Sequence, residues 1–378
     1  MIQNRSLSLL CLAAAWSLAL TGASFASGRF ALEQTPDGKF WFVDAENPGE
    51  PFVSLGVNHI VPVHDFMAPP DTTYYNAVER QFDGDFEAWA ADARRILKHA
   101  GFNTIGAWSD PKLNDGSLYE TPILYVISAE PNRVTTILDP QLEERMTRNV
   151  RKVFADLVHP EQVLGVFLDN EMAWYGVSPW TPLDYHTVLE EYLALPADSL
   201  HRGEAMKWLK ARYDGDAKAF AEAWKIEMVD WDDLTDALAK STTSEGALAD
   251  RAAFTEMVAE LFYSTARRVM DRERPGTLLL GTRFAGTAPK PVVEICGRYC
   301  DVVSFNNYRG SSREDWRLIA RYWIEGGRKP LMITEFSWRA EQNTSGNPNK
   351  AARARWCKPR PSAAPAMMTS CRTTWHGR

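Results

Sequence analysis

The sequence predicts an α/β fold of the (β/α)₈ TIM-barrel class. Short apolar runs alternate with long segments of helical period, and seven such runs occur in order, most of them followed by polar or aromatic residues. A chain of 378 residues, 45% of them hydrophobic, can bury a core of that size. The predicted strands are residues 52–58, 102–108, 123–128, 163–168, 277–282, 302–305 and 330–334.

The chain opens with the pattern of a secretory signal. Arg5 lies in a short polar head, residues 7–20 are apolar, and the small residues Ser24 and Ala26 predict cleavage after Ala26. No later segment reaches about 20 uninterrupted apolar residues, the length that a membrane span needs. We therefore expect residues 1–26 to be removed and the rest to be secreted or periplasmic, with a catalytic domain over residues 27–349.

Between the signal and the first strand, alternating residues turn at Asp37-Gly38, which predicts a hairpin. Helices are predicted over residues 86–101, closed by Gly101, and over residues 142–158 and 253–276. Residues 180–246, rich in Trp, Tyr and acidic residues, are predicted to be a helical insertion after strand four. Each strand-helix-strand unit should cross over right-handed.

The eighth strand of the barrel is missing from the pattern. Residues 350–378 contain no apolar run, are basic in an acidic chain, and gather Pro, Arg, Cys and Ser. We predict that this segment is an aberrant, disordered tail that cannot close a sheet.

Composition excludes several kinds of partner. The net charge of -7 and the pI of about 5.6 argue against a nucleic-acid or anionic-membrane surface. The chain has seven histidines and no GxGxxG turn, so neither a metal site nor a nucleotide cofactor is predicted. Cys296 and Cys300 are either a disulfide or two small core residues, and the sequence leaves both alternatives open.

Polar and aromatic side chains gather where the predicted strands end, which in a parallel barrel is one mouth. They are Asn58, His59, Trp108, Asp110, Asn170, Glu171, Arg283, Asn306, Asn307, Tyr308, Glu335 and Trp338. Aromatic faces stack on sugar rings, amides bind hydroxyls, and two carboxyl groups can break a glycosidic bond. This inventory predicts a polysaccharide or oligosaccharide substrate.

These residues carry a resemblance to clan-A glycoside hydrolases, which are retaining enzymes on a (β/α)₈ barrel. The matching motifs are "DNE" after strand four, "NNY" after strand six and "ITEFSW" at strand seven. Within the clan, "FVSLGVNHI", "GFNTIGAWSD", "RYDGDAKAFAEAW" and "LLLGTRFAG" resemble the agarase-type family, glycoside hydrolase family 50 (GH50), over residues 30–349. The chain departs from the clan in placing Trp108 where many members have an arginine.

The resemblance implies a role for each matching residue. Glu171 would be the acid/base and Glu335 the nucleophile of a double displacement, with Asn170 holding the sugar 2-hydroxyl and Tyr308 bonded to the nucleophile. The expected activity is β-agarase-like hydrolysis of a galactan without a cofactor. The other expected substrate-binding residues are Arg283, Asn58, His59, Trp108, Asn307 and Trp338.

Retention requires the two carboxyl groups to lie about 5–5.5 Å apart. Two negative charges so close together are unfavourable, so only one of the two groups should be ionised at the start. We expect Glu171 to start protonated and Glu335 ionised.

Other interpretations remain open. Asn170 and Glu171 could be the start of a helix, and Asp169 and Asp110 are interpreted as loop caps. The substrate could instead be that of a β-galactosidase or of another clan-A endo-glycanase. A chain without an eighth strand could also be an inactive, truncated carbohydrate-binding remnant, which a broad unfolding transition at low temperature would reveal.

Overall fold

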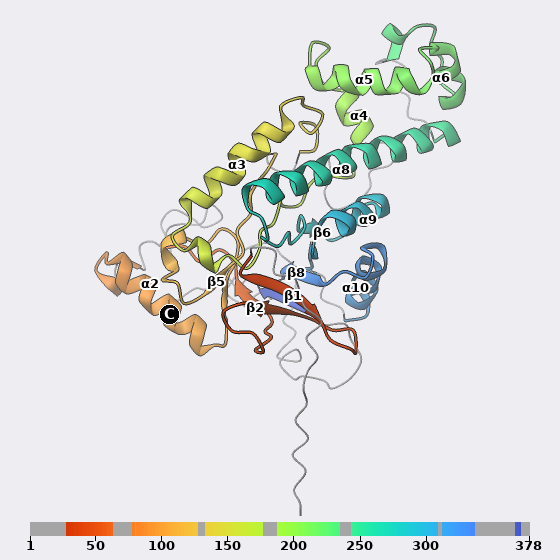
Figure 1. The fold of residues 1–378 in the computed structure, drawn as a ribbon. Helices are drawn as coiled ribbons and strands as arrows, with labels where there is room; N and C mark the ends of the chain where they lie inside the picture. Colours follow the sequence, from red (N-terminus) through yellow and green to blue (C-terminus); the bar gives the residue numbers. More distant parts are fainter. Residues whose placement is uncertain are drawn as a thin grey trace, which may run out of the picture.

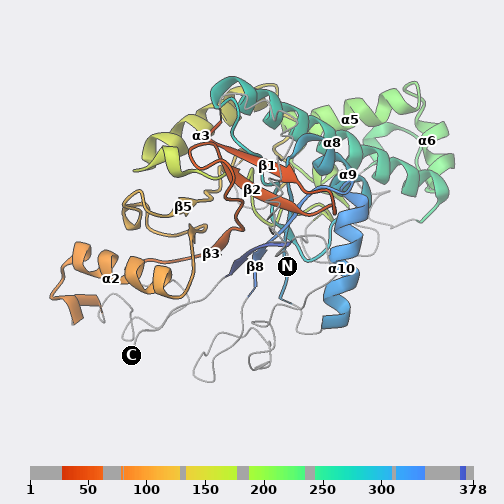
Figure 2. The same cartoon turned by 60° about the horizontal axis from the view of Figure 1, so that its bottom comes forward.

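The computed structural model describes residues 28–62, 78–79, 81–127, 133–176, 187–234, 243–308, 312–336 and 367–371. The predicted signal lies outside these residues. The predicted hairpin is confirmed: β1 (Phe30–Gln34) pairs antiparallel with β2 (Phe40–Asp44). Gly38 supplies the positive φ of 83° that its turn requires. Figure 2 shows this hairpin between α2 on one side and α10 on the other.

Seven strands form one sheet in the order β5-β4-β3-β9-β8-β7-β6, and all the neighbours in it are parallel. The strands are β3 (Leu55–Val57), β4 (Thr104–Ile105), β5 (Tyr119–Glu120), β6 (Phe284–Ala285), β7 (Val303–Asn306), β8 (Leu331–Glu335) and β9 (Met367–Cys371). The continuous ladder does not close into a barrel. Between β5 and β6, single bridges join Glu120 to Val163, Ile123 to Phe167 and Val166 to Leu279.

The prediction that nothing after Lys350 can contribute a strand is wrong. β9 pairs with β8 on one side and with β3 on the other, which is the position of an eighth barrel strand. Both neighbours would otherwise present unpaired backbone groups, so a five-residue segment of adequate β-propensity can be captured there by backbone hydrogen bonds. The eighth strand is therefore present, and the remainder of residues 337–378 lies outside the described part.

Three other predicted strands differ from the structure. In the third predicted strand, residues 123–128, Ile123 makes an isolated bridge, whereas the ladder strand β5 lies before Pro122, and Tyr125 takes a left-handed backbone with φ of 48°. Residues 163–168 and 277–282 make isolated bridges and no ladder. Their side chains are nonetheless buried as predicted, because helices cover the outer face of the sheet.

Helices surround the strands (Figure 1). They are α2 (Phe86–His99), α3 (Leu142–Asp156), α8 (Glu245–Glu273), α9 (Lys290–Tyr299) and α10 (Ser312–Glu325). α2 begins at Asp85, whose carboxylate accepts from Ala88 N, and Gly101 follows its end with φ of 83°. Short 3₁₀ turns occur at Pro111–Leu113 and Pro160–Gln162.

The predicted insertion is helical where it is described. It contains α4 (Val188–Leu193), α5 (Leu200–Arg212), α6 (Ala217–Trp224) and a 3₁₀ turn at Trp231–Asp233, whereas α8 begins already within its predicted range. Figure 1 shows α5 and α6 beside the far end of α8. Asp250 of α8 anchors them, since it accepts from Trp224 Nε1 at 2.7 Å and from Tyr213 Oη at 2.6 Å.

Three apolar clusters pack against the sheet, and one of them joins α2 to β3 and β4. The larger of the other two packs helices on the outer face of the strands. The smaller lies inside, where Phe30 and Phe42 of the hairpin meet Leu164, Leu280 and Met332. Cys296 and Cys300 are free and buried in the larger cluster, which supports the core-residue alternative. Within the described residues, no helix has both the length and the apolar character of a membrane span.

Candidate active site

Five residues that follow strands or strand-like segments have a left-handed backbone. They are His59 (φ 61°), Trp108 (58°), Tyr125 (48°), Glu171 (49°) and Arg283 (51°). Bulky residues rarely adopt this conformation, and each instance costs on the order of 1–3 kcal/mol. Such strain persists where surrounding contacts impose it, and it is concentrated at functional sites. The carboxyl end of the sheet therefore carries the strongest backbone signal of function.

Glu335 is the last residue of β8 and is only 3% exposed. Arg283 Nη2 donates to its Oε1 at 2.7 Å, and the Tyr308 hydroxyl donates to its Oε2. A buried carboxylate needs such partners, because an unpaired buried charge costs several kcal/mol. The structure thus brings together the predicted nucleophile, Tyr308, which was expected to bond to it, and Arg283, which was expected to bind substrate.

Arg283 is completely buried and is held from several directions. Its guanidinium lies 4.9 Å from the ring centre of Trp108 and 5.0 Å from that of Phe167. Its Nε donates to Asn170 Oδ1 at 2.8 Å. The ring of Trp108 therefore supports the guanidinium of Arg283. Trp108 occupies the position at which the sequence resemblance leads one to expect an arginine, and Arg283 supplies an arginine from elsewhere in the chain.

Asn170 and Glu171 approach the same network from the segment after residue 168. The Asn170 Oδ1 is taken by Arg283, which leaves its Nδ2 as the donor for a sugar hydroxyl. Glu171 is half-buried, and its Oε1 accepts from Asn306 Nδ2 at 2.8 Å. Neither residue begins a helix, so the helix-start alternative is excluded.

Asn306 was given no role among the predicted catalytic and substrate-binding residues, yet it lies within the network. Its Oδ1 accepts from the Thr334 hydroxyl at 2.7 Å, so it links Glu171 to the residue before Glu335. A register shift between Phe305 and Asn306 accompanies this arrangement, and the next residue, Asn307, donates its backbone N–H to Glu335 O at 2.8 Å. The "NNY" motif indicated that Asn306 and Asn307 lie near the site, but a motif does not show which asparagine contacts which glutamate.

The remaining predicted residues are placed differently. Asn58 is fully buried, and its Nδ2 donates to Thr334 O at 2.8 Å, so it ties β3 to β8 beneath the carboxylates. A Cβ on Gly106 would lie 2.0 Å from Asn58 Oδ1, which explains a glycine there. His59 is half-buried, and its backbone N–H donates to Ala107 O at 2.8 Å. Trp338 lies outside the described residues.

The two aspartates interpreted as loop caps differ in environment. Asp110 Oδ1 accepts from Lys112 N at 2.9 Å at the start of the 3₁₀ turn, as a cap does. Asp169 is fully buried, and its Oδ1 accepts from Asn170 N at 2.9 Å. Burial raises the pKa of Asp169 to about 7, against the smaller opposite effect of its backbone hydrogen bonds.

Asp169→Asn is expected to remove a pH dependence of stability. The unfolded chain releases this proton near pH 4 and the folded chain keeps it until about pH 7, so the wild-type free energy of unfolding falls as the pH rises through that window. Asparagine keeps the acceptor for Asn170 N and does not titrate. The free energy of unfolding of Asp169→Asn, relative to that of the wild type, should rise by roughly 2–4 kcal/mol between pH 4.5 and 8.

Urea midpoints at the two pH values measure this effect. Asp85→Asn, at the exposed start of α2, is the matched control. An advantage of Asp169→Asn that is the same at both pH values would contradict a proton-bearing Asp169.

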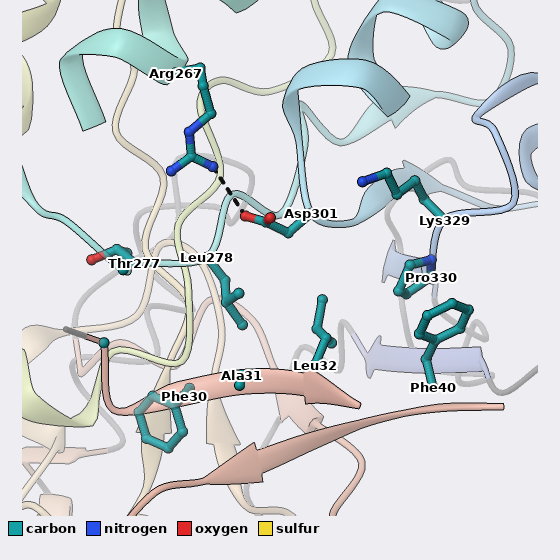
Figure 3. Close-up of a pocket in the computed structure, with 12 residues that line it drawn as sticks. Phe30, Ala31, Leu32, Phe40, Arg267, Thr277, Leu278, Asp301, Lys329 and Pro330 are labelled. Carbon is teal, nitrogen blue, oxygen red and sulfur yellow. Dashed lines mark hydrogen bonds and ion pairs between the residues drawn. The ribbon is translucent and has the colours of Figure 1, made fainter. Parts of the chain in front are cut away.

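A hollow of about 410 Å³ lies at the opposite, amino end of the strands. Figure 3 shows Leu32 and Phe40 of the hairpin on one side of it and the pair Arg267–Asp301, 3.3 Å apart, on the other. No carboxyl pair with shared donors lines it. Because chemistry in parallel barrels resides at the carboxyl end, the network around Glu335 is the better candidate site. Within the described residues, no cluster of three His, Cys, Asp or Glu could hold a metal ion.

Comparison with known proteins finds similarity to a β-agarase. Over 275 residues, 67% of this chain, the sequence is 26% identical to β-agarase A of Vibrio sp. (strain JT0107). The chain spans about a quarter of that relative, since the match covers 27% of its length. No family model matches the chain.

Solved structures give the fold. An exo-β-agarase superposes with a TM-score of 0.65 at 20% identity, over 84% of this chain and 54% of that one. The agarase AgWH50C gives 0.63 at 21% identity, and PfGH50B gives 0.64 at 20%, each over 83% of this chain and 53% of the other.

Proposed function

From the premise that this chain has a GH50 agarase-like fold, we propose that it is a retaining glycoside hydrolase that cleaves β-galactosidic linkages of agarose or a related galactan. The observation that carries the proposal is the network that joins the two glutamates. Glu335 is bonded to the Arg283 guanidinium and the Tyr308 phenol, which suits an anionic nucleophile. Glu171 accepts from the amide of Asn306, which is itself bonded to Thr334 beside Glu335, so the second carboxyl group is held at the same end of the sheet for acid/base work.

The first chemical step forms the glycosyl-enzyme. A carboxylate oxygen of Glu335 attacks the anomeric carbon, while Glu171 gives its proton to the departing glycosidic oxygen. The Asn170 Nδ2 donates to the 2-hydroxyl of the sugar, an interaction that strengthens in an oxocarbenium-like transition state. Arg283 holds both Asn170 and Glu335, so it fixes these two contacts relative to each other.

The second step releases the sugar. Once Glu335 is esterified, its negative charge is gone, and Glu171 can remain ionised and take a proton from water as that water attacks the anomeric carbon. Two displacements at the same carbon give net retention of configuration. Every catalytic group in this cycle is a side chain of the protein, and no cofactor takes part.

Two alternatives to this proposal concern the substrate and the integrity of the fold. A β-galactosidase or another clan-A endo-glycanase would use the same two glutamates with different loops. The inactive-remnant alternative depended on a missing eighth strand, and β9 fills that position. The secretory signal pattern, together with the polymeric substrate, supports a secreted or periplasmic location as part of the proposal.

Reducing-sugar release by the purified full chain from agarose, other galactans and glucans tests the proposal, alongside hydrolysis of an aryl β-galactoside. We expect oligosaccharides from agarose and little release from glucans. Release from the aryl galactoside without any from agarose would favour the β-galactosidase alternative. No release from any of these substrates by a cooperatively folded chain would reject the hydrolase proposal.

A further inference from the structure

Tyr125 belongs to none of the roles assigned so far, although it lies beside the candidate site. It is half-buried after β5, and Asn149 Nδ2 donates to its backbone carbonyl at 2.7 Å. With φ of 48°, it is one of the five strained residues at the carboxyl end of the sheet. A contact that the fold holds in place at the cost of strain is a candidate for function.

The hydroxyl of Tyr125 accepts a hydrogen bond, and its own proton is available for donation. Trp108 Nε1 donates to it at 2.6 Å. Because the indole can only donate, the tyrosine proton must point elsewhere, and no acceptor for it occurs within the described part of the chain. The indole also rests on Arg283, so Trp108 connects Tyr125 directly to the guanidinium that holds Glu335.

The electrostatic surroundings place this hydroxyl near the reacting groups. Burial raises the pKa of Tyr125, Trp108 lowers it, and the charges of Asp169, Arg283 and Glu335 also act on it. The hydroxyl therefore keeps its proton at neutral pH. Trp108 and Tyr125 also line a hollow of about 160 Å³, together with Ser109 and Glu120, so neither ring is packed on every side.

We propose that Tyr125 is a substrate-binding residue that donates its hydroxyl proton to an oxygen of the sugar bound beside Glu335, with Trp108 setting the direction of that donation. The inference rests on the proposed function, because it requires a sugar at the carboxyl end of the sheet. Trp108 then has two roles, since one face of its ring supports Arg283 and its indole N–H orients the tyrosine.

Tyr125→Phe removes the donor with little change of shape. Loss of one neutral hydrogen bond should weaken binding of an agarose-derived tetrasaccharide about 3- to 10-fold, as measured by calorimetric titration in a Glu171→Ala background that turns over slowly. Tyr119→Phe is the matched control, because Tyr119 is also half-buried but stacks on Phe52 at 4.6 Å, away from the carboxylates. It should leave the affinity within about 2-fold and the Tm unchanged, whereas Tyr125→Phe, which removes the hydroxyl that accepts from Trp108 Nε1, should lower the Tm by a few degrees while the chain stays folded.

Fluorination of the tyrosine ring distinguishes the hydrogen bond that the hydroxyl donates to the sugar from the hydrogen bond that it accepts from Trp108 Nε1. A 3-fluorotyrosine at position 125 is a stronger donor and a weaker acceptor than tyrosine. It should therefore tighten tetrasaccharide binding at pH 6, where the phenol keeps its proton. Weaker binding, or an unchanged affinity of Tyr125→Phe, would overturn the inference.

Failure of this inference and failure of the proposed function give different results. Hydrolysis of agarose by the wild type, with binding indifferent to Tyr125, rejects the inference and leaves the function standing. Tetrasaccharide binding that depends on Tyr125, without hydrolysis by the wild type, rejects the function and keeps the inference. A chain that binds no tetrasaccharide rejects the inference.

Discussion

Glu335→Gln should abolish measurable turnover of agarose, lowering kcat by at least roughly 10⁴-fold. An amide cannot form the glycosyl ester that the double displacement needs, so the first step loses its nucleophile. The fold should tolerate the change. Glutamine can present its oxygen to Arg283 and its NH₂ to Tyr308, whose hydroxyl can accept as well as donate, so no buried polar group is left unpaired.

Initial rates of reducing-sugar release and a thermal unfolding curve of the same preparation test this prediction together. Glu190→Gln is the matched control, since Glu190 of α4 is a buried carboxyl paired with an arginine, Arg251, away from the candidate site. It should keep activity within a few-fold. Near-normal activity of Glu335→Gln would show that the nucleophile is a different group. Lost activity together with a lost folding transition would show that the ion pair with Arg283 is essential to the fold.

The features that the sequence predicted correctly depend on local patterns. Asp85 and Gly101 mark the two ends of α2, and Asp37-Gly38 marks the hairpin turn, because each signal lies within a few residues of the structure it specifies. The side chains at the carboxyl ends of strands follow from the topology of a parallel sheet. Glu335, Tyr308 and Arg283 could therefore be grouped before their contacts were known.

The features that it missed depend on distant partners. β9 is a strand because β8 and β3 leave a place for one, and its own five residues carry only a weak pattern. Asn306 faces Glu171 because of a register shift that no periodicity encodes. The left-handed backbone of Tyr125 and its bond to Trp108 arise from packing between loops that are 17 residues apart.

Glu171→Ala should affect two substrates very differently. For agarose, whose leaving group is an alkoxide, loss of the proton donor should lower kcat/KM by about 10²–10⁴-fold. For an aryl β-galactoside with a good leaving group, formation of the glycosyl-enzyme needs little acid assistance, so kcat/KM should fall much less. Hydrolysis of the intermediate still needs a base, so kcat should be low and the intermediate should accumulate.

Azide separates the acid and base roles of Glu171. A small anion can enter the space left by the side chain and attack the anomeric carbon without a general base, so kcat on the aryl galactoside should rise with azide concentration. The product should be the β-galactosyl azide, because the attack displaces Glu335 from the opposite face.

The Glu335→Ala variant gives the mirror-image expectation. Azide there replaces the nucleophile itself, so a single displacement should give the α-galactosyl azide. Nuclear magnetic resonance of the anomeric proton distinguishes the two products. If Glu171→Ala lost equal activity on both substrates and azide restored none, Glu171 would not act as the acid/base, and its bond to Asn306 would be a structural contact at the edge of a site built on Glu335 and Arg283.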